Sequence, residues 1–459
     1  MTTGWRVQIV ACAAATSLLV GPVVSTQPRA PNYITLADVR PLLAPLAASL
    51  PPDLPPTSGP QADNRWLAWI ASHDLAIRQR LREGDEDTIL NWLLLGQSFT
   101  SLPPVRIAGD ASEATLANAT ELIRARVDAL IQALESPGGD ERRRFARTYF
   151  EGRGLRFGDR SRQAASRNYL LQALQRMFQA ARGQQPGART ATATPTSPFE
   201  RRGLSLDTTI QPNFAVERSL LNLKIRRLIP AGSVRRVAIV GPGLDFADKN
   251  TGFDFYPVQT VQPFAVLDAL RRHDLIDRAG GVEIVAFDIS SRVLEHIAAA
   301  RKAAAAGYVL RLPLARTEQW SPELRRYWNT FGDQIGTPIS SPAPAGIDLR
   351  TIRVSAAAVN SLVTDNANVI VERSRQAPFD LVIATNVLLY YGAFDQALAM
   401  SNVEAMLEGG GLFLTNTALP DVPSSRLTRV GSEVTLYTTD GRGDEIIWYQ
   451  RPAEPGPRQ

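Results

Sequence analysis

Two short segments carry residues whose types and spacing could bind a ligand. Gly241 and Gly243 follow directly on the apolar run 237–240, and glycines after a buried strand let the backbone turn sharply and approach a ligand closely. Asp288 ends the next such run, where a carboxylate can accept two hydrogen bonds from a ribose diol. Each segment also has a simpler interpretation. The glycines could form only a tight turn, and Asp288 could cap a helix that begins near Ser290.

A third segment, residues 379–391, joins an apolar strand pattern to a polar and aromatic end. The apolar run stops at Asn386, and the aromatic pair Tyr390 and Tyr391 follows. An amide and two phenols at a strand end can contact a ligand, and the phenols can form an apolar wall or act as weak acids or bases.

Alternating strand and helix patterns must position these segments. Strands are expected at 236–240, 282–287, 351–357, 380–385 and 411–416, and helices at 215–228, 263–272, 292–306 and 393–407. Strands separated by crossover helices predict a mostly parallel sheet in an α/β fold. Two further strands, 434–438 and 445–449, flank a glycine-containing turn and predict an antiparallel hairpin at the C-terminal end.

In order and content, residues 205–452 resemble the class I S-adenosylmethionine-dependent methyltransferases. In that family a glycine motif follows strand 1, an acidic residue ends strand 2, and a hairpin closes the sheet. The resemblance implies a Rossmann-like sheet, S-adenosylmethionine as cofactor and a methyltransferase activity whose acceptor the sequence does not identify. It implies that Gly241 and Gly243 contact the methionine part and that Asp288 holds the ribose.

The same resemblance implies a catalytic edge formed by Asn386, Tyr390 and Tyr391, with Asn386 contacting cofactor or substrate. Two positions depart from the family pattern. Ile239 stands where an acidic residue is common, and Asp245 stands where a third glycine is common. We therefore take Asp245 as a further candidate contact to the cofactor.

An insertion at about 308–346 has two interpretations. Its aromatic residues either line a substrate cleft or pack the insertion onto the sheet; they are Trp320, Tyr327, Trp328 and Phe331.

Two other functions compete with a methyltransferase. A nicotinamide-dependent Rossmann enzyme would need a third glycine where Phe246 stands, and no Tyr-x-x-x-Lys pair follows. The second alternative is an exported, non-catalytic methyltransferase-like binding or structural module. The altered glycine motif favours it, as does the export signal described next, because this cofactor is made in the cytoplasm.

The N-terminal half differs in composition from the rest. Residues 1–30 have a basic start, an apolar stretch and small residues before Thr26, which predicts a cleaved signal peptide. The alternatives are an uncleaved anchor, a misassigned start codon or a buried helix. Residues 31–182 predict an α-helical accessory domain with a helix break near Gly84. Residues 183–204 are a polar linker, and 205–459 form the α/β domain.

Composition limits the remaining functions. The chain has 459 residues, 44% hydrophobic and 21% charged, which excludes a disordered chain and a polytopic membrane protein. Its 50 basic and 45 acidic residues are interspersed, so no nucleic-acid partner is expected, and the arginine bias is typical of GC-rich bacterial coding. With a single cysteine, Cys12, and three scattered histidines, no metal site is expected. We expect an exported or N-terminally anchored protein that meets the membrane only through residues 1–30, or a cytoplasmic one if that segment is no signal.

Overall fold

The computed structural model describes residues 30–105, 113–158, 160–182, 204, 210–248, 251–277 and 281–453. The described residues from Asn32 onward form one compact unit. The expected signal peptide at 1–30 lies outside the described residues except for Ala30, and the linker at 183–204 lies outside them except for Leu204. The signal, the linker and the domain boundary that the linker marks therefore stay predictions.

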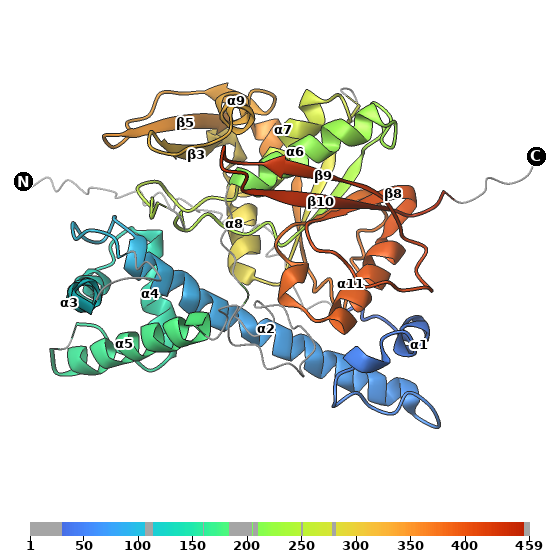
Figure 1. The fold of residues 1–459 in the computed structure, drawn as a ribbon, viewed down its shortest axis with the longest axis horizontal. Coiled ribbons are helices and arrows are strands. Elements are labelled where there is room, and N and C mark those ends of the chain that lie inside the picture. The colour runs from blue at the N-terminus through green and yellow to red at the C-terminus, as the bar shows by residue number, and fades with distance from the viewer. Residues whose placement is uncertain are drawn as a thin grey trace, which may run out of the picture. The chain divides into compact units, whose positions relative to one another are not determined.

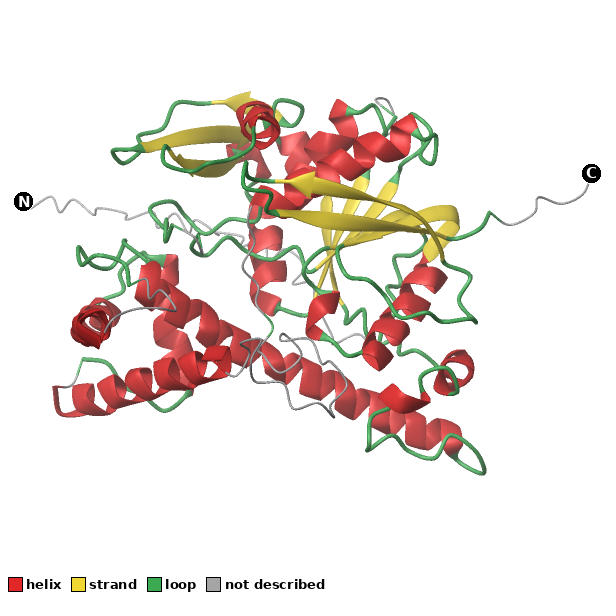
Figure 2. Ribbon diagram, viewed as in Figure 1, coloured by secondary structure: helices red, strands yellow, loops and turns green. Residues whose placement is uncertain are grey.

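The sheet that the strand pattern predicts is present and has seven strands (Figure 1, Figure 2). Its order is β6-β2-β1-β7-β8-β10-β9. The strands are β1 Arg236–Val240, β2 Glu283–Asp288, β6 Leu362–Asn366, β7 Phe379–Ala384, β8 Leu407–Thr415, β9 Thr428–Leu436 and β10 Gly443–Gln450. The first five in this order pair in parallel, and β10 pairs antiparallel with both of its neighbours. This confirms the α/β fold with a C-terminal hairpin.

The expected third parallel strand at 351–357 was wrong. Those residues belong largely to β5 Ile347–Val354, which joins β3 Tyr308–Ala315 and β4 Gly336–Pro338 in a separate three-stranded antiparallel sheet. The third parallel strand is β6, and it lies at the edge of the large sheet. An edge strand is less enclosed than a central one, so β6 needs little apolar sequence, and its second half is polar.

The insertion packs onto the α/β core, which settles its two interpretations. Trp320, Tyr327, Trp328 and Phe331 are all buried within the same core cluster as the sheet. The Trp328 indole N–H donates to the Leu312 carbonyl at 3.0 Å. These aromatic residues therefore stabilise the insertion and do not form a substrate cleft.

Alternate residues of the central strands face two separate cores, as a period of two requires. Val237 and Ile239 of β1 face one core, which helices α6, α7 and α8 cover, whereas Ala238 and Val240 face another, which α1 and α11 cover. These helices are α1 Leu36–Leu43, α6 Ile210–Ile225, α7 Gln262–Arg272, α8 Ser291–Lys302 and α11 Ala393–Met406. The shorter helices are η1 Ala47–Ser49, η2 Ala304–Ala306, α9 Pro322–Thr330, α10 Ala356–Asn360 and η3 Leu388–Tyr390.

The expected helices of the N-terminal half are present, but the break near Gly84 was wrong. The helices are α2 Ala62–Leu95, α3 Glu113–Glu135, α4 Glu141–Gly152 and α5 Arg160–Arg182. Gly84 lies inside the 34-residue helix α2. A Cβ there would lie 1.9 Å from the Leu204 carbonyl oxygen, so this glycine permits a close backbone approach and does not end a helix.

Buried polar contacts connect α2 with the α/β part of the chain. The Asp254 carboxylate, in the loop between β1 and α7, accepts hydrogen bonds from the Trp92 indole N–H at 2.6 Å and the Ser98 hydroxyl at 2.7 Å. Asp254 is 2% exposed, and the backbone N–H groups of Gln97 and Ser98 also donate to it. Among the described residues, no helix is both long and apolar enough to cross a membrane.

Candidate functional site

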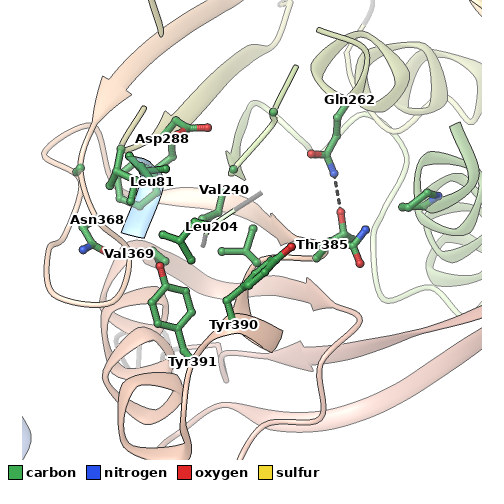
Figure 3. Close-up of a pocket in the computed structure, with 18 residues that line it drawn as sticks. Leu81, Leu204, Val240, Gln262, Asp288, Asn368, Val369, Thr385, Tyr390 and Tyr391 are labelled. Carbon is green, nitrogen blue, oxygen red and sulfur yellow. Dashed lines mark hydrogen bonds between the residues drawn. The ribbon is translucent and has the colours of Figure 1, made fainter. Parts of the chain in front are cut away.

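A pocket opens at the carboxyl ends of β1, β2 and β7, with an empty volume of about 770 Å³ that includes its open mouth (Figure 3). The chain runs outward from β1 to β2 and β6 on one side and through β7 and β8 on the other, so the pocket lies where the strand order reverses. Open α/β sheets bind ligands at this point. The pocket is lined by Leu81, Leu204, Pro212, Val240, Gly241, Gly243, Gln262, Phe287, Asp288, Ile289, Ala367, Asn368, Val369, Thr385, Asn386, Val387, Tyr390 and Tyr391.

Gly241 and Gly243 both line this pocket and both adopt positive φ, 63° and 65°. Residues with a side chain rarely adopt this backbone conformation, so the turn after β1 depends on glycine. A Cβ at Gly241 would lie 2.7 Å from Cγ2 of Val387, which also lines the pocket. A side chain at residue 241 would therefore collide with Val387.

Asp288 ends β2, lines the pocket and is only 4% exposed. Its Oδ1 accepts a hydrogen bond from the Ser290 backbone N–H at 2.8 Å, and Ser290 is the N-cap residue of α8. Its Oδ2 is buried without a hydrogen-bond partner among the described residues. Asp288 can therefore hold the start of α8 with Oδ1 and still bind a ligand with Oδ2.

Burial is the main cause of the raised pKa of the Asp288 carboxyl. It raises this pKa to about 6, although the nearby backbone N–H groups of Ser290, Ile289 and Gly243 lower it. Asp288 is thus largely ionised at neutral pH, with one oxygen left to accept hydrogen bonds from a ligand.

Asp245, the other candidate for cofactor contact, does not line the pocket. Its Oδ1 accepts from the Tyr256 hydroxyl at 3.1 Å and its Oδ2 from the Gln259 amide at 2.9 Å. Burial raises the pKa of this carboxyl to about 7. Both oxygens are used within the loop that follows β1, so the geometry offers no support for the predicted cofactor contact.

Asn386 follows β7 and lines the pocket in a left-handed conformation, with φ 58°. Its backbone N–H donates to Asn416 Oδ1 at 2.8 Å, and Asn416 donates from its own amide to Asn386 Oδ1 at 2.7 Å. This reciprocal pair joins the ends of β7 and β8. It fixes the direction of the Asn386 side chain at the pocket rim.

Tyr390 and Tyr391 line the pocket next to Asn386, and Figure 3 shows both rings directed into it. Tyr391 is 4% exposed. Burial raises the pKa of its hydroxyl well above the ordinary value, although Arg80 lowers it. Tyr391 therefore stays protonated at neutral pH, which suits a wall or a hydrogen-bond donor and not a general base.

The structure adds pocket residues that the sequence patterns did not indicate. Gln262, at the start of α7, donates to the Thr385 hydroxyl at 2.8 Å, and both residues are buried at the pocket (Figure 3). Residues 367–369 belong to the loop after β6 and were missed because that strand was missed. Leu81 and Leu204 come from outside the α/β strands, where no local pattern marks a pocket residue.

The described residues contain no group of three or more histidine, cysteine, aspartate or glutamate side chains placed to hold a metal ion. His73 contacts Asp395 at 2.8 Å, His273 contacts Glu217 at 2.7 Å, and His296 contacts the Tyr308 hydroxyl at 2.7 Å. Each of the three histidines thus has a different partner.

No protein-family model matches the chain, and no curated protein matches it. Among solved structures it is similar to the N-methyltransferase NodS from Bradyrhizobium japonicum WM9, with 12% identity over 52% of this chain and 94% of that chain and a TM-score of 0.26. It is also similar to magnesium protoporphyrin IX methyltransferase (ChlM) from Synechocystis PCC 6803 with bound SAM, with 10% identity over 60% of this chain and 96% of that chain and a TM-score of 0.26. These TM-scores are low, so the two likenesses carry no conclusion about function.

Proposed function

We propose that this chain is an S-adenosylmethionine-dependent methyltransferase. The observation that carries the proposal is Asp288, a buried carboxylate at the end of β2 that lines the pocket and has one oxygen without a partner among the described residues. Leaving a buried ionised oxygen unpaired is costly, and a ribose diol would supply the missing donors. The strand order and the two positive-φ glycines at the end of β1 support the same proposal.

The residues around Asp288 fit the rest of such a cofactor. The backbone at Gly241 and Gly243 would contact the methionine part, as the absence of side chains permits. Apolar side chains of Phe287, Ile289 and Val369 line the pocket beside Asp288 and suit the faces of an adenine ring.

When bound, S-adenosylmethionine supplies an electrophilic methyl group on a sulfonium, so the protein contributes mainly position. Tyr390 and Tyr391 would provide aromatic faces, which favour a nearby cation. Asn386, held by Asn416, would present its amide to cofactor or acceptor from a fixed position. The acceptor class stays open in this proposal.

Isothermal titration with S-adenosylhomocysteine, the demethylated product, tests the proposal directly. Wild-type chain should bind it, and Asp288→Ala should weaken binding by about tenfold or more, because hydrogen bonds to a charged group are worth about 1.5–3 kcal/mol. Asp421→Ala, which removes an exposed carboxylate, is the matched control and should bind like wild type. Absence of binding by wild type, or full binding by Asp288→Ala, would show that the proposal is wrong.

A further inference from the structure

One stretch of helix α2 contacts both loops that border the pocket. From this helix, the Arg78 guanidinium donates to Asn366 Oδ1 at 2.9 Å and to Glu372 Oε1 at 3.0 Å. Asp74, one turn earlier, accepts from the Asn368 amide at 2.9 Å. The loop after β6, which forms one rim of the pocket, is therefore held by charged side chains of α2.

Arg80 makes the corresponding contacts with the opposite rim, after β7. Its guanidinium donates to the Tyr390 carbonyl at 2.8 Å, and its Cζ lies 5.3 Å from the centroid of the Tyr391 ring. Hydrogen bonds from a charged donor are stronger than neutral ones, and a cation over an aromatic face is attractive. One side chain thus fixes both the backbone and a ring of the aromatic wall.

The same turn of α2 also contributes to the pocket directly. Leu81 lines the pocket next to Arg80. The Arg80 carbonyl accepts the backbone N–H of Leu204, another lining residue, at 3.0 Å. Gly84 leaves the space in which the Leu204 backbone lies. The helix that the sequence assigned to an accessory domain therefore forms part of the pocket wall.

We propose that Arg80 is a positioning residue for the ligand pocket, acting on the cofactor site through Tyr390 and Tyr391. This inference depends on the proposed function, because it assumes that the pocket holds the cofactor. The Arg80 side chain touches two lining residues, Tyr390 and Tyr391; the contact with Leu204 uses the backbone carbonyl, which every Arg80 variant keeps. Removal of the side chain releases the aromatic wall while Asp288 and the glycine turn stay in place, so binding weakens and is not abolished.

The test is titration of the full chain with S-adenosylhomocysteine, together with the melting temperature of each variant. Arg80→Ala should raise Kd by about tenfold, the loss expected for a charge-assisted hydrogen bond. Arg80→Lys keeps a charged donor and should lose less affinity than Arg80→Ala, a partial rescue that general loss of stability does not give. Arg82→Ala, which removes an exposed arginine of the same helix, should bind like wild type.

The outcomes separate this inference from the proposed function. If wild type does not bind, the proposed function fails and the inference fails with it. If wild type binds and Arg80→Ala binds equally well, only the positioning role is overturned. If Arg80→Ala folds poorly, Arg80→Gln takes its place, and a folded Arg80→Gln that binds like wild type would overturn the role.

Discussion

At the scale of single residues, the Asp288 carboxylate is both buried and ionised, and burial opposes ionisation. A carboxylate near the interior is penalised by desolvation, which favours its neutral form. The backbone N–H groups of Ser290, Ile289 and Gly243 offset this penalty only in part, and the pKa stays raised at about 6. A ligand that donates to the remaining oxygen stabilises the ionised form further. Ligand binding should therefore be linked to the ionisation of this one group.

The linkage gives a pH dependence with a definite sign. Because the ionised form is the better acceptor and the pKa is about 6, affinity for S-adenosylhomocysteine should be constant from pH 8 to about 7. As the pH falls through 6, the carboxyl gains a proton and Kd should rise, by up to about tenfold per pH unit. Isothermal titration at a series of pH values measures this profile.

Asp288→Asn provides the comparison for that profile. The amide cannot ionise, so this variant should bind more weakly at pH 8 and show little change down to pH 5. Asp245, whose pKa of about 7 belongs to a separate buried group, stays intact in the variant and controls for general effects of pH. A wild-type Kd that is flat to pH 5 would contradict the assignment of Asp288 to the ligand.

Some site residues could be predicted from the sequence and others could not, depending on where each lies along the chain. Gly241 and Asp288 directly follow or end strong strand patterns, so their place at the carboxyl edge could be expected. Asp245 also follows a strand, but its partners Tyr256 and Gln259 come from a loop without periodicity. Leu81 reaches the pocket from a distant helix, and only the tertiary fold could reveal that.

At the scale of elements, the predictions from sequence were wrong where a contact between distant segments outweighed a local preference. Gly84 looks like a helix end because glycine costs about 1 kcal/mol inside a helix. Here the cost is offset by the approach of Leu204. Similarly, 351–357 has the stronger strand pattern, but its strand residues pair with β3 and β4 of the insertion, and the weaker β6 completes the parallel sheet.

The Gly84 contact can be tested with alanine. By helix propensity alone, Gly84→Ala should stabilise the protein, but the new Cβ would lie 1.9 Å from the Leu204 carbonyl oxygen. We expect a net loss of about 1–3 kcal/mol, as for other overpacked sites, and weaker binding of S-adenosylhomocysteine, because Leu204 lines the pocket. Thermal unfolding and titration measure the two effects.

Gly152→Ala is the matched control, since Gly152 ends α4 and a Cβ there would meet no atom within 4 Å. It should leave both stability and binding at or slightly above wild type. A Gly84→Ala variant that is as stable as Gly152→Ala would show that Leu204 does not need the space at residue 84.

At the scale of the whole molecule, Asp254 is one of the buried polar contacts that join α2 and the residues after it to the α/β part. It accepts from an indole N–H, a hydroxyl and two backbone N–H groups while 2% exposed. Asp254→Ala leaves these donors without their acceptor, at a cost of about 1–3 kcal/mol for each group that stays unpaired. We expect a clearly lower melting temperature and an earlier calorimetric transition for the helical half.

Asp254→Asn keeps one carbonyl acceptor of nearly the same shape and should lose much less stability than the alanine variant. Calorimetry of the full chain distinguishes the two. A single transition at the wild-type temperature in Asp254→Ala would contradict a structural role for this carboxylate.

The distance along the chain between Arg80 and Tyr390 has a consequence for biosynthesis. These contact partners are 310 residues apart, and Arg78 and Asn366 are 288 apart. Helix α2 leaves the ribosome long before either rim of the pocket has been translated. The nascent chain must keep that helix available until β7 and η3 emerge, so the cavity can take its final form only near the end of translation.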